Sequence, residues 1–464
     1  MTDQGPSSAK QTRYMLRSNT RSGLAIAEHN ESTDGKRKRK GPLRLMDLND
    51  DCLLAVFGNM NVIELSDVAE TCKRTQELVQ YTFRLKHHHR LDLISLAGHN
   101  LKLALRLLRN FGGHASSLNM TRNVLFSHKQ EAASRKLLSL IAKYCRPNTL
   151  TELSLSRFII TPASMKDLKE LFGSLEILKL ENTTIKDCDL SPFKDNLKVL
   201  KLKDSDFCDS TYRFPVYKPL ITFVNTTTAL QVLSICSSTR LTQSRTRVYQ
   251  AISELKDLEE LELNERSLGG CEKTFQRICT YLFALNNLKV LKINCHGYSV
   301  QQLVEGLAAN NIAIEHLSVT CVKFGDIFDD AIAIGKLKTI KVLKLLNARM
   351  VIDAHLLIIV NDLKLLSELV VTGWISVNVT QQGIVEMLRE ADRLSCLKIN
   401  TCHFQFNIGT YDEMLAIIKN RPEHIKLQLI FGHWSREPFD PEGNLRSNDK
   451  LLSVKAVSPL FNIQ

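Results

Sequence analysis

Aliphatic residues recur along this chain in one local pattern, L-x-x-L-x-L, where x is most often polar. Ten clear copies begin at Leu150, Leu175, Leu197, Leu230, Leu258, Leu288, Ile314, Ile340, Leu366 and Leu394. Consecutive copies start 25, 22, 33, 28, 30, 26, 26, 26 and 28 residues apart. The alternation at the end of each copy predicts a half-buried strand. Weaker copies lie around Leu91/Leu93, Leu118/Met120 and Leu427/Leu429, which makes about thirteen units in all.

Between the strands, helical periodicity predicts a return helix in most units. The expected segments are Ser164–Phe172, Thr246–Leu255, Thr274–Leu285, Val300–Ala309, Asp326–Leu337, Gln381–Ala391 and Tyr411–Lys419. The 22-residue step leaves little room for a full helix. The 33-residue step carries an insert at residues 212–219 with two prolines and three aromatic residues. Two interpretations stay open: a recognition loop, or a surface loop whose aromatic rings pack against the protein.

The spacing resembles that of leucine-rich repeats, in which each unit is one strand plus a return segment. A single unit cannot bury its own apolar face, so the units are expected to stack around one continuous core. The predicted fold class is therefore α/β, a leucine-rich-repeat solenoid with a curved parallel sheet inside and helices outside. Such long curved surfaces usually hold other proteins.

The residue between the last two leucines of each copy is expected to point into the hollow. This column contains Ser154, Lys179, Lys201, Ser234, Glu262, Lys292, Ser318, Lys344, Val370, Lys398 and Gln428. Two interpretations stay open: a plain solvated face, or a basic track for an acidic or phosphorylated partner segment. The predicted substrate-binding residues are Lys179, Lys201, Glu262, Lys292, Lys344 and Lys398, and Glu259, Glu260 and Glu262 would instead receive a basic side chain.

A second outward column lies two residues earlier and contains Ile177, Val199, Val232, Val290 and Val342. β-branched residues suit pleated strands, which explains them structurally. Exposed in the hollow, they would also give it a partly apolar lining.

Before the repeats, three short amphipathic helices are predicted. Asn49 can cap the first, whose opening turn holds Asp50 and Asp51. The apolar stripes are Leu53, Val56, Phe57 and Met60, then Leu65, Val68, Ala69 and Cys72, then Leu78, Val79 and Phe83. About forty residues form too small a core to stand alone, so these helices need a partner, the solenoid end, or both.

Residues 48–78, LNDDCLLAVFGNMNVIELSDVAETCKRTQEL, resemble an F-box. The positions that match are Leu48, Asp51, Leu53, Leu54, Val56, Phe57, Leu65, Val68, Cys72, Lys73 and Arg74. Asn49, Cys52 and Thr75 depart from the Pro, Leu and Trp that are frequent in the family. The order of this segment and the repeats is similar to that of F-box/leucine-rich-repeat proteins.

The resemblance implies a non-catalytic substrate receptor of an SCF ubiquitin ligase. The F-box would bind the Skp-type adaptor, and through it a cullin, while the repeats bind a protein substrate. The implied adaptor-binding residues are Leu48, Asp51, Leu53, Leu54, Val56 and Phe57. The alternatives are a helical segment that only caps the solenoid, and a scaffold or nuclear interaction protein with no ligase association.

The charge of the chain is +12, and it is unevenly distributed. Residues 1–42 hold nine Lys/Arg against four acids and show no apolar period, which predicts a disordered basic arm. Within it, Lys36, Arg37, Lys38, Arg39 and Lys40 form a basic run that suits an import receptor such as importin. A solvated charge run is the alternative, and nucleic-acid binding is the least favoured.

Composition excludes several other classes. The twelve cysteines lack a C-x-x-C pair, the N-terminus lacks an apolar signal core, and the longest aliphatic run is Leu356–Val360. His87-His88-His89 is interpreted as a solvated basic patch, and Cys295-His296 and Cys402-His403 as turn packing. We therefore expect no cofactor, metal, catalytic centre or membrane contact, and a location in the nucleus and/or cytoplasm.

The sequence thus predicts four parts. They are a basic arm at residues 1–42, an F-box-like helical domain at 43–87, the solenoid at 88–432 and a C-terminal cap or tail at 433–464.

Overall fold

The structure is a computed structural model of the 464-residue chain. It describes residues 45–93, 101–122, 130–188, 190, 193, 196–208, 218–227, 229–237, 245–265, 272–295, 298–324, 328–373, 377–400, 408–421, 425–431 and 451–456. Contacts divide the chain into two compact units, residues 1–49 and 50–464. In the first unit the described residues form one short 3₁₀ turn, Leu45–Asp47.

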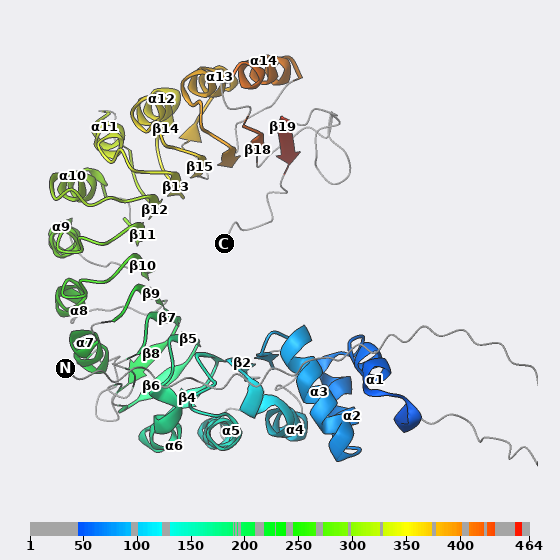
Figure 1. Cartoon of the computed structure of the whole chain (residues 1–464). Helices are drawn as coiled ribbons and strands as arrows, with labels where there is room; N and C mark the ends of the chain where they lie inside the picture. Colours follow the sequence, from blue (N-terminus) through cyan, green and yellow to red (C-terminus); the bar gives the residue numbers. More distant parts are fainter. Residues whose placement is uncertain are drawn as a thin grey trace, which may run out of the picture. The chain divides into compact units, whose positions relative to one another are not determined.

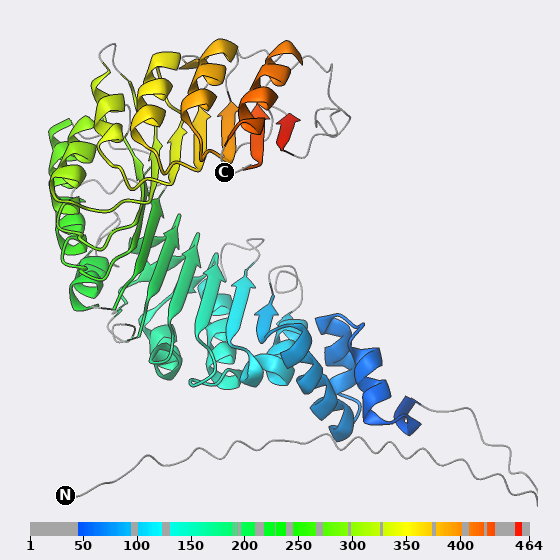
Figure 2. The ribbon, with the colours of Figure 1, turned by 45° about the horizontal axis from the view of Figure 1, so that its top comes forward.

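The described strands of the second unit form one long sheet of fourteen strands, and every neighbouring pair is parallel. In sheet order the strands are β1 (Arg90–Asp92), β2 (Ser117–Thr121), β3 (Glu152–Ser156), β5 (Ile177–Glu181), β7 (Val199–Lys203), β9 (Val232–Ser237), β10 (Glu260–Glu265), β11 (Val290–Asn294), β12 (His316–Thr320), β13 (Val342–Leu346), β15 (Glu368–Thr372), β17 (Cys396–Asn400), β18 (Leu427–Phe431) and β19 (Leu452–Ala456). Each of the thirteen predicted units supplies one strand. The sheet lies on the inner side of an arc, with the helices of the repeats outside (Figure 1, Figure 2).

The aliphatic positions of the repeat meet in register and form the core. Leu291, Leu317 and Leu343 pair directly across neighbouring strands, and all three side chains are fully buried. The first leucine of each copy is buried too, from Leu150 to Leu394. A slip of one residue would turn each of these rows toward solvent, so the register is strongly fixed. The predicted parallel solenoid is therefore confirmed.

The outer helices are α4 (Leu101–Phe111), α5 (Gln130–Tyr144), α6 (Pro162–Phe172), α7 (Lys218–Thr226), α8 (Arg245–Ile252), α9 (Glu272–Leu282), α10 (Gln301–Ala309), α11 (Asp329–Gly335), α12 (Asp353–Asp362), α13 (Gln381–Glu390) and α14 (Ile408–Lys419). Each of the seven expected segments overlaps one of these helices. Local capping explains several starts: the Thr161 hydroxyl accepts from the Ser164 amide, and Thr380 does the same for Gly383. The helices α4, α5, α7 and α12 were not among those expected from the sequence.

The short 22-residue step is closed without a helix in its described residues. Instead, β6 (Thr184–Lys186) joins β4 (Ile159–Ile160) and β8 (Asp206–Cys208) in a small parallel sheet. Phe193 is buried beside it, with ring centroids 4.0 Å from Phe172 and 6.5 Å from Phe223. Phe193 thereby links Phe172 of α6 to Phe223 of α7 in one aromatic cluster. A similar short pairing joins β14 (Val351–Ile352) to β16 (Val377–Asn378).

The three predicted N-terminal helices form a head, α1 (Asp50–Phe57), α2 (Val62–Ala69) and α3 (Lys73–Lys86). A capping box starts α2: Asn61 Oδ1 accepts from the amides of Ile63 and Glu64, and Glu64 Oε2 accepts from the Asn61 amide at 2.7 Å. Asp50 at the start of α1 pairs with Arg74 of α3 at 2.7 Å. The capping box therefore sets the start of α2, and the ion pair links α1 to α3.

The head shares its core with the first outer helix of the solenoid. The rings of Phe83 on α3 and Phe111 on α4 stack with centroids 4.6 Å apart. Beside them, the buried Asn110 side chain donates to the Ser66 hydroxyl at 2.9 Å. Ion pairs of Arg106 with Asp67 and of Arg109 with Glu70 close the outer edge. The head is therefore anchored on the solenoid end, as its small size requires.

The sheet continues past residue 432, where the sequence predicts the repeats to end. Leu452 and Val454 of β19 pair with Leu427 and Leu429 of β18, and all four side chains are buried. A short aliphatic alternation inside the predicted tail thus adds a fourteenth strand to the ladder. Its copy has Leu451 at the first position but Val454 and Ala456 in place of the two later leucines, which explains why the pattern misses it.

The buried leucine rows predict a clear stability difference. Leu317→Ala opens a cavity in the middle of the ladder and should lower the free energy of unfolding by about 2–5 kcal/mol. Ile332→Ala, at a side chain that is 47% exposed, should change it by less than about 0.5 kcal/mol. Urea unfolding followed by circular dichroism measures both, and equal losses would contradict the placement of the core.

Candidate partner-binding surfaces

The inner face of the sheet presents its outward residues in columns that follow the strand register. One column runs through Lys179, Lys201, Ser234, Glu262, Lys292, Ser318, Lys344, Val370 and Lys398. The second predicted column, from Ile177 to Val342, lies beside it and is half-buried. The structure thus brings all six predicted substrate-binding residues onto one face, as neighbours along a single row.

Three of the five lysines of this column are ion-paired with a glutamate on the adjacent strand. Lys179 Nζ lies 2.6 Å from Glu152 Oε1, Lys292 Nζ lies 2.7 Å from Glu260 Oε1, and Lys344 Nζ lies 3.0 Å from Glu368 Oε1. These glutamates occupy the column two residues earlier, so each pair is a diagonal contact between neighbouring strands. The expected basic track is therefore largely neutralised by the chain itself.

Lys201 and Lys398 differ from these three. Both are half-buried, and the described residues give neither of them an ion pair within 4.0 Å. Glu262 accepts a hydrogen bond from the Ser234 hydroxyl at 2.9 Å. The column is also less exposed than predicted, because Ser318 and Val370 are buried.

The last position of the predicted column is corrected by the register. Leu397 pairs with Leu429, so the residue next to Lys398 is Ile430, and Gln428 lies opposite Cys396 in the earlier column. The two leucines at 427 and 429 resemble the end of the repeat pattern, but they occupy positions shifted by two residues. Only the pairing of β18 with β17 decides between the two alignments.

A second set of ion pairs follows the rim where the strands begin. Glu176 pairs with Lys198, Glu259 with Lys289 and Glu315 with Lys341, at 3.1, 3.1 and 2.9 Å. These residues occupy the second position of the repeat, where acid and base alternate between units. This alternation is visible in the sequence as Glu176, Lys198, Glu259, Lys289, Glu315 and Lys341. Each pair is exposed and contributes little alone.

The centre of the inner face has a distinct electrostatic environment. Burial would raise the pKa of Glu260, but the hydrogen bond and charge of Lys292, with Lys201 and His316, hold it below its ordinary value. Burial lowers the pKa of His316, and Lys344 and Lys292 lower it further against the opposing effect of Glu368 and Glu260. His316 Nε2 is buried with no hydrogen-bond partner in the described part of the chain.

On the head, the adaptor-binding residues expected from the sequence divide into two groups. Leu53 and Phe57 are fully buried in the core of the three helices, so they do not form an accessible surface. Asp51 and Val56 are exposed, and Leu54 is half-buried. Leu48 belongs to the separate unit of residues 1–49. The helical stripe was predicted correctly, but its two innermost members are used to hold the head together.

Two apolar residues of α3 complete the accessible surface of the head, and sequence reasoning missed both. Leu85 is 60% exposed, the largest value among the big apolar side chains of the described residues, and Tyr81 is 44% exposed. They lie four residues apart on one face of α3, away from the buried Val79 and Phe83. The signal was a second apolar stripe on α3, offset from the one that packs inward.

The histidine run lies in the turn between α3 and β1. His88 and His89 have φ values of 47° and 60°, and His89 Nδ1 is 2.9 Å from the His114 carbonyl oxygen. Burial, Lys86 and His88 lower the pKa of His87. No group of three or more potential metal ligands occurs among the residues that the structure describes. Cys295 is fully buried, and its burial raises its pKa.

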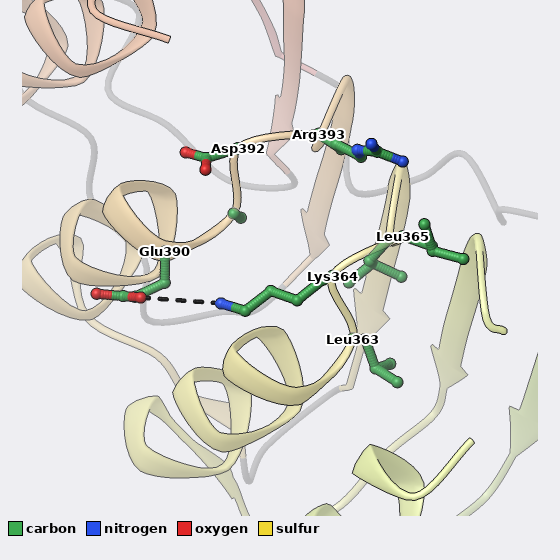
Figure 3. A pocket seen from close by; sticks show the side chains of 8 residues that line it. Leu363, Lys364, Leu365, Glu390, Asp392 and Arg393 are labelled. Carbon is green, nitrogen blue, oxygen red and sulfur yellow. Dashed lines mark ion pairs between the residues drawn. The ribbon is translucent and has the colours of Figure 1, made fainter. Parts of the chain in front are cut away.

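A recess of about 250 Å³ lies at the edge where α12 and α13 turn into their strands (Figure 3). Leu363 and Leu365 line one side, and Asp392 and Arg393 line the other. Lys364 Nζ reaches across to Glu390 Oε2 at 4.0 Å. Its charged groups are exposed and do not converge on one point, so the recess has the character of a surface groove between two turns.

Several predicted features fall outside the described residues. They are the basic run Lys36, Arg37, Lys38, Arg39 and Lys40, the insert at 212–217, His296, and Cys402-His403. Among the helices that are described, none combines the length and apolar character needed to span a bilayer.

No known protein family matches the sequence, and no curated protein matches it either. Among solved structures, internalin C2 from Listeria monocytogenes is similar over 57% of this chain and 83% of its own, with 17% identity and a TM-score of 0.28. A likeness of this size carries no argument about function. The assignment to a leucine-rich-repeat solenoid rests on the strand pairing and buried columns of this chain.

The ion pairs of the inner face predict a measurable titration change. Lys292→Met should raise the pKa of Glu260, because burial remains while the largest opposing influence, the hydrogen bond and charge of the ammonium group, is lost. In the wild type the folded-state pKa is depressed, so ionised Glu260 stabilises the fold at neutral pH, and this stabilisation is lost as the pH falls through that pKa.

Carboxyl ¹³C NMR of the two proteins measures the shift. Lys289→Met removes an equal charge from the rim of the same repeat and should leave Glu260 almost unchanged. An unshifted Glu260 in Lys292→Met would show that the pair does not exist in solution.

Proposed function

We propose that this protein is a non-catalytic substrate receptor of an SCF-type ubiquitin ligase. The head would bind a Skp-type adaptor, and the inner face of the solenoid would bind the protein to be ubiquitinated. The observation that carries the proposal is that one compact unit has two separate surfaces. One is a short three-helix head with exposed apolar residues, and the other is a long parallel sheet with a charged and partly apolar inner face.

The F-box resemblance of residues 48–78 supplies the first half of the proposal, and the structure modifies which residues would make the contact. Val56, Tyr81 and Leu85 are the large apolar side chains of the head that remain at least 37% exposed. Exposed apolar groups on a small, tightly packed head are suited to form the buried centre of an interface. Asp51 and Leu54 would lie at its edge.

The second half follows from the shape of the repeat unit. A continuous sheet of parallel strands offers many outward side chains on one surface, and the solenoid fixes their spacing. Holding a substrate there would raise its local concentration near the charged ubiquitin carrier, while the covalent chemistry takes place on other subunits. No chemical step is assigned to the residues of this chain.

The main alternative is a repeat scaffold without a ligase, whose helices only cap the solenoid. The close junction between the head and α4, through Phe83, Phe111 and Asn110, favours this reading. A cap and an adaptor-binding head are compatible, since the junction uses one side of the helices and leaves Tyr81 and Leu85 accessible. Direct binding to the adaptor separates the two.

The test is capture of a recombinant Skp-type adaptor by the full chain. The double variant Val56→Arg/Leu85→Arg should weaken adaptor binding by about tenfold or more, because charges at the centre of an apolar interface are costly. The residues are exposed, so its melting temperature should remain close to that of the wild type.

The matched control is Ile332→Arg/Leu365→Arg, which places the same charges at exposed apolar residues of the solenoid. It should bind the adaptor like the wild type. Absence of adaptor binding by the wild type, or equal losses in both double variants, would favour the scaffold alternative.

A further inference from the structure

Outward ion pairs lie on both sides of β12 within strands β10 to β15, and β10 carries a further acid, Glu262, where β15 has Val370. Glu260 on β10 pairs with Lys292 on β11, and Glu368 on β15 pairs with Lys344 on β13. The register places Lys292 and Lys344 on either side of Ser318 in β12. Across these five neighbouring strands the charges therefore run negative, positive, neutral, positive, negative.

The uncharged middle of this pattern, on β12, is recessed between the two lysine-bearing strands. Ser318 is buried, and His316, two residues earlier, lies between Val290 and Val342 in register. Each lysine turns its ammonium group away from β12 toward its glutamate. Burial is the largest cause that lowers the pKa of His316. Among the charges, Lys344 and Lys292 lower this pKa by more than Glu368 and Glu260 raise it.

The spacing of this pattern matches an extended peptide. Neighbouring strands are about 4.8 Å apart, so the negative strands β10 and β15 each lie about 10 Å from β12. A chain in the extended polyproline II conformation advances about 3.1 Å per residue with three residues per turn, so side chains three positions apart lie on one face about 9 Å from each other. A peptide crossing the strands with an anion over β12 would place residues three positions away, on both sides, over Glu260 and Glu368.

We propose that strands β10–β15 form a docking site for an extended protein segment with a central anionic side chain and a basic residue three positions to either side. The anion would lie between Lys292 and Lys344, and the flanking cations would contact Glu260 and Glu368. This inference rests on the proposed use of the inner face as a partner-binding surface. On this proposal the inner face recognises the order of charges in a partner segment and not merely its net negative charge.

The site makes binding depend on pH. An anion between the lysines offsets the charges that disfavour protonated His316, so the pKa of His316 rises on binding. The groups that act on it are Lys292 and Lys344 from the flanking strands, and Glu260 and Glu368 from the next strands outward. A group whose pKa is higher in the complex takes up protons on binding, so affinity increases as the pH falls through the pKa that His316 has in the complex.

The test uses the full chain and nine-residue Gly/Ser peptides measured by fluorescence anisotropy at low salt. One peptide has Lys at positions two and eight and Glu at position five, and its isomer has Glu at position two and Lys at positions five and eight. We expect the first to bind about fivefold or more tightly than the isomer. A third peptide with phosphoserine at position five identifies the kind of anion. If it binds more tightly than the first peptide, the partner is phosphorylated; if it binds equally or more weakly, the central anion is a carboxylate.

A charge-swapped variant tests the pattern without changing the net charge of the protein. Glu260→Lys/Lys292→Glu/Lys344→Glu/Glu368→Lys keeps both ion pairs but reverses the order of the charges. It should lose the preference for the first peptide and favour one with Glu at positions two and eight and Lys at position five. Lys289→Met/Lys341→Met removes two rim lysines of the same repeats and should retain the wild-type preference.

Equal binding of the two isomers, or an unchanged preference in the charge-swapped variant, would overturn the inference. His316→Asn should remove the increase in affinity at falling pH, and a retained increase would exclude His316 as its source. The outcome is independent of adaptor capture. If the wild type binds the adaptor but shows no peptide preference, only this inference fails, and the reverse result removes the ligase assignment alone.

Discussion

The fold depends on rows of aliphatic side chains that meet in register across fourteen parallel strands. Each fully buried leucine contributes about 1.5–3 kcal/mol relative to an exposed one, and no repeat can bury its leucines alone. Leu291, Leu317 and Leu343 show the arrangement at its centre. Because side chains alternate along a strand, fixing the inward rows also fixes the outward ones. Every property of the inner face follows from this constraint.

The same register decides how the charges of the inner face interact. Lysines that are distant in the sequence from their partners, such as Lys292 and Lys344, are placed one strand away from Glu260 and Glu368. The short distances and partial burial favour pairing over independent solvation. The surface therefore has a defined order of charges, with Lys292 and Lys344 on the strands next to β12 and Glu260 and Glu368 one strand farther out. Under the docking proposal, such a surface would discriminate between partners by the spacing of their charges.

Packing also decides which residues of the head are available. Three helices of this length cannot form a core without Leu53, Phe57, Val79 and Phe83, and the last of these extends the core to Phe111 of α4. Leu53 and Phe57, which match the F-box pattern, are thus buried in the core of the head and are not accessible to a partner. Val56, Tyr81 and Leu85 remain for a partner. The proposed adaptor contact is consistent with a head that is rigid because it is anchored on the solenoid.

The sequence by itself determined the repeat, its parallel stacking, the strands of all thirteen recognised units and the identity of the outward column, because the period of buried leucines leaves one workable arrangement. It did not determine the pairing of Lys179, Lys292 and Lys344, the position of Ile430 in place of Gln428, or the strand at Leu452–Ala456. It also could not separate the buried Phe57 from the exposed Leu85, since both lie on apolar helical stripes. These features depend on which side chains meet across strands and helices far apart in the chain. A local pattern specifies the face on which a residue lies, whereas its partner on that face is set only when the units pack together.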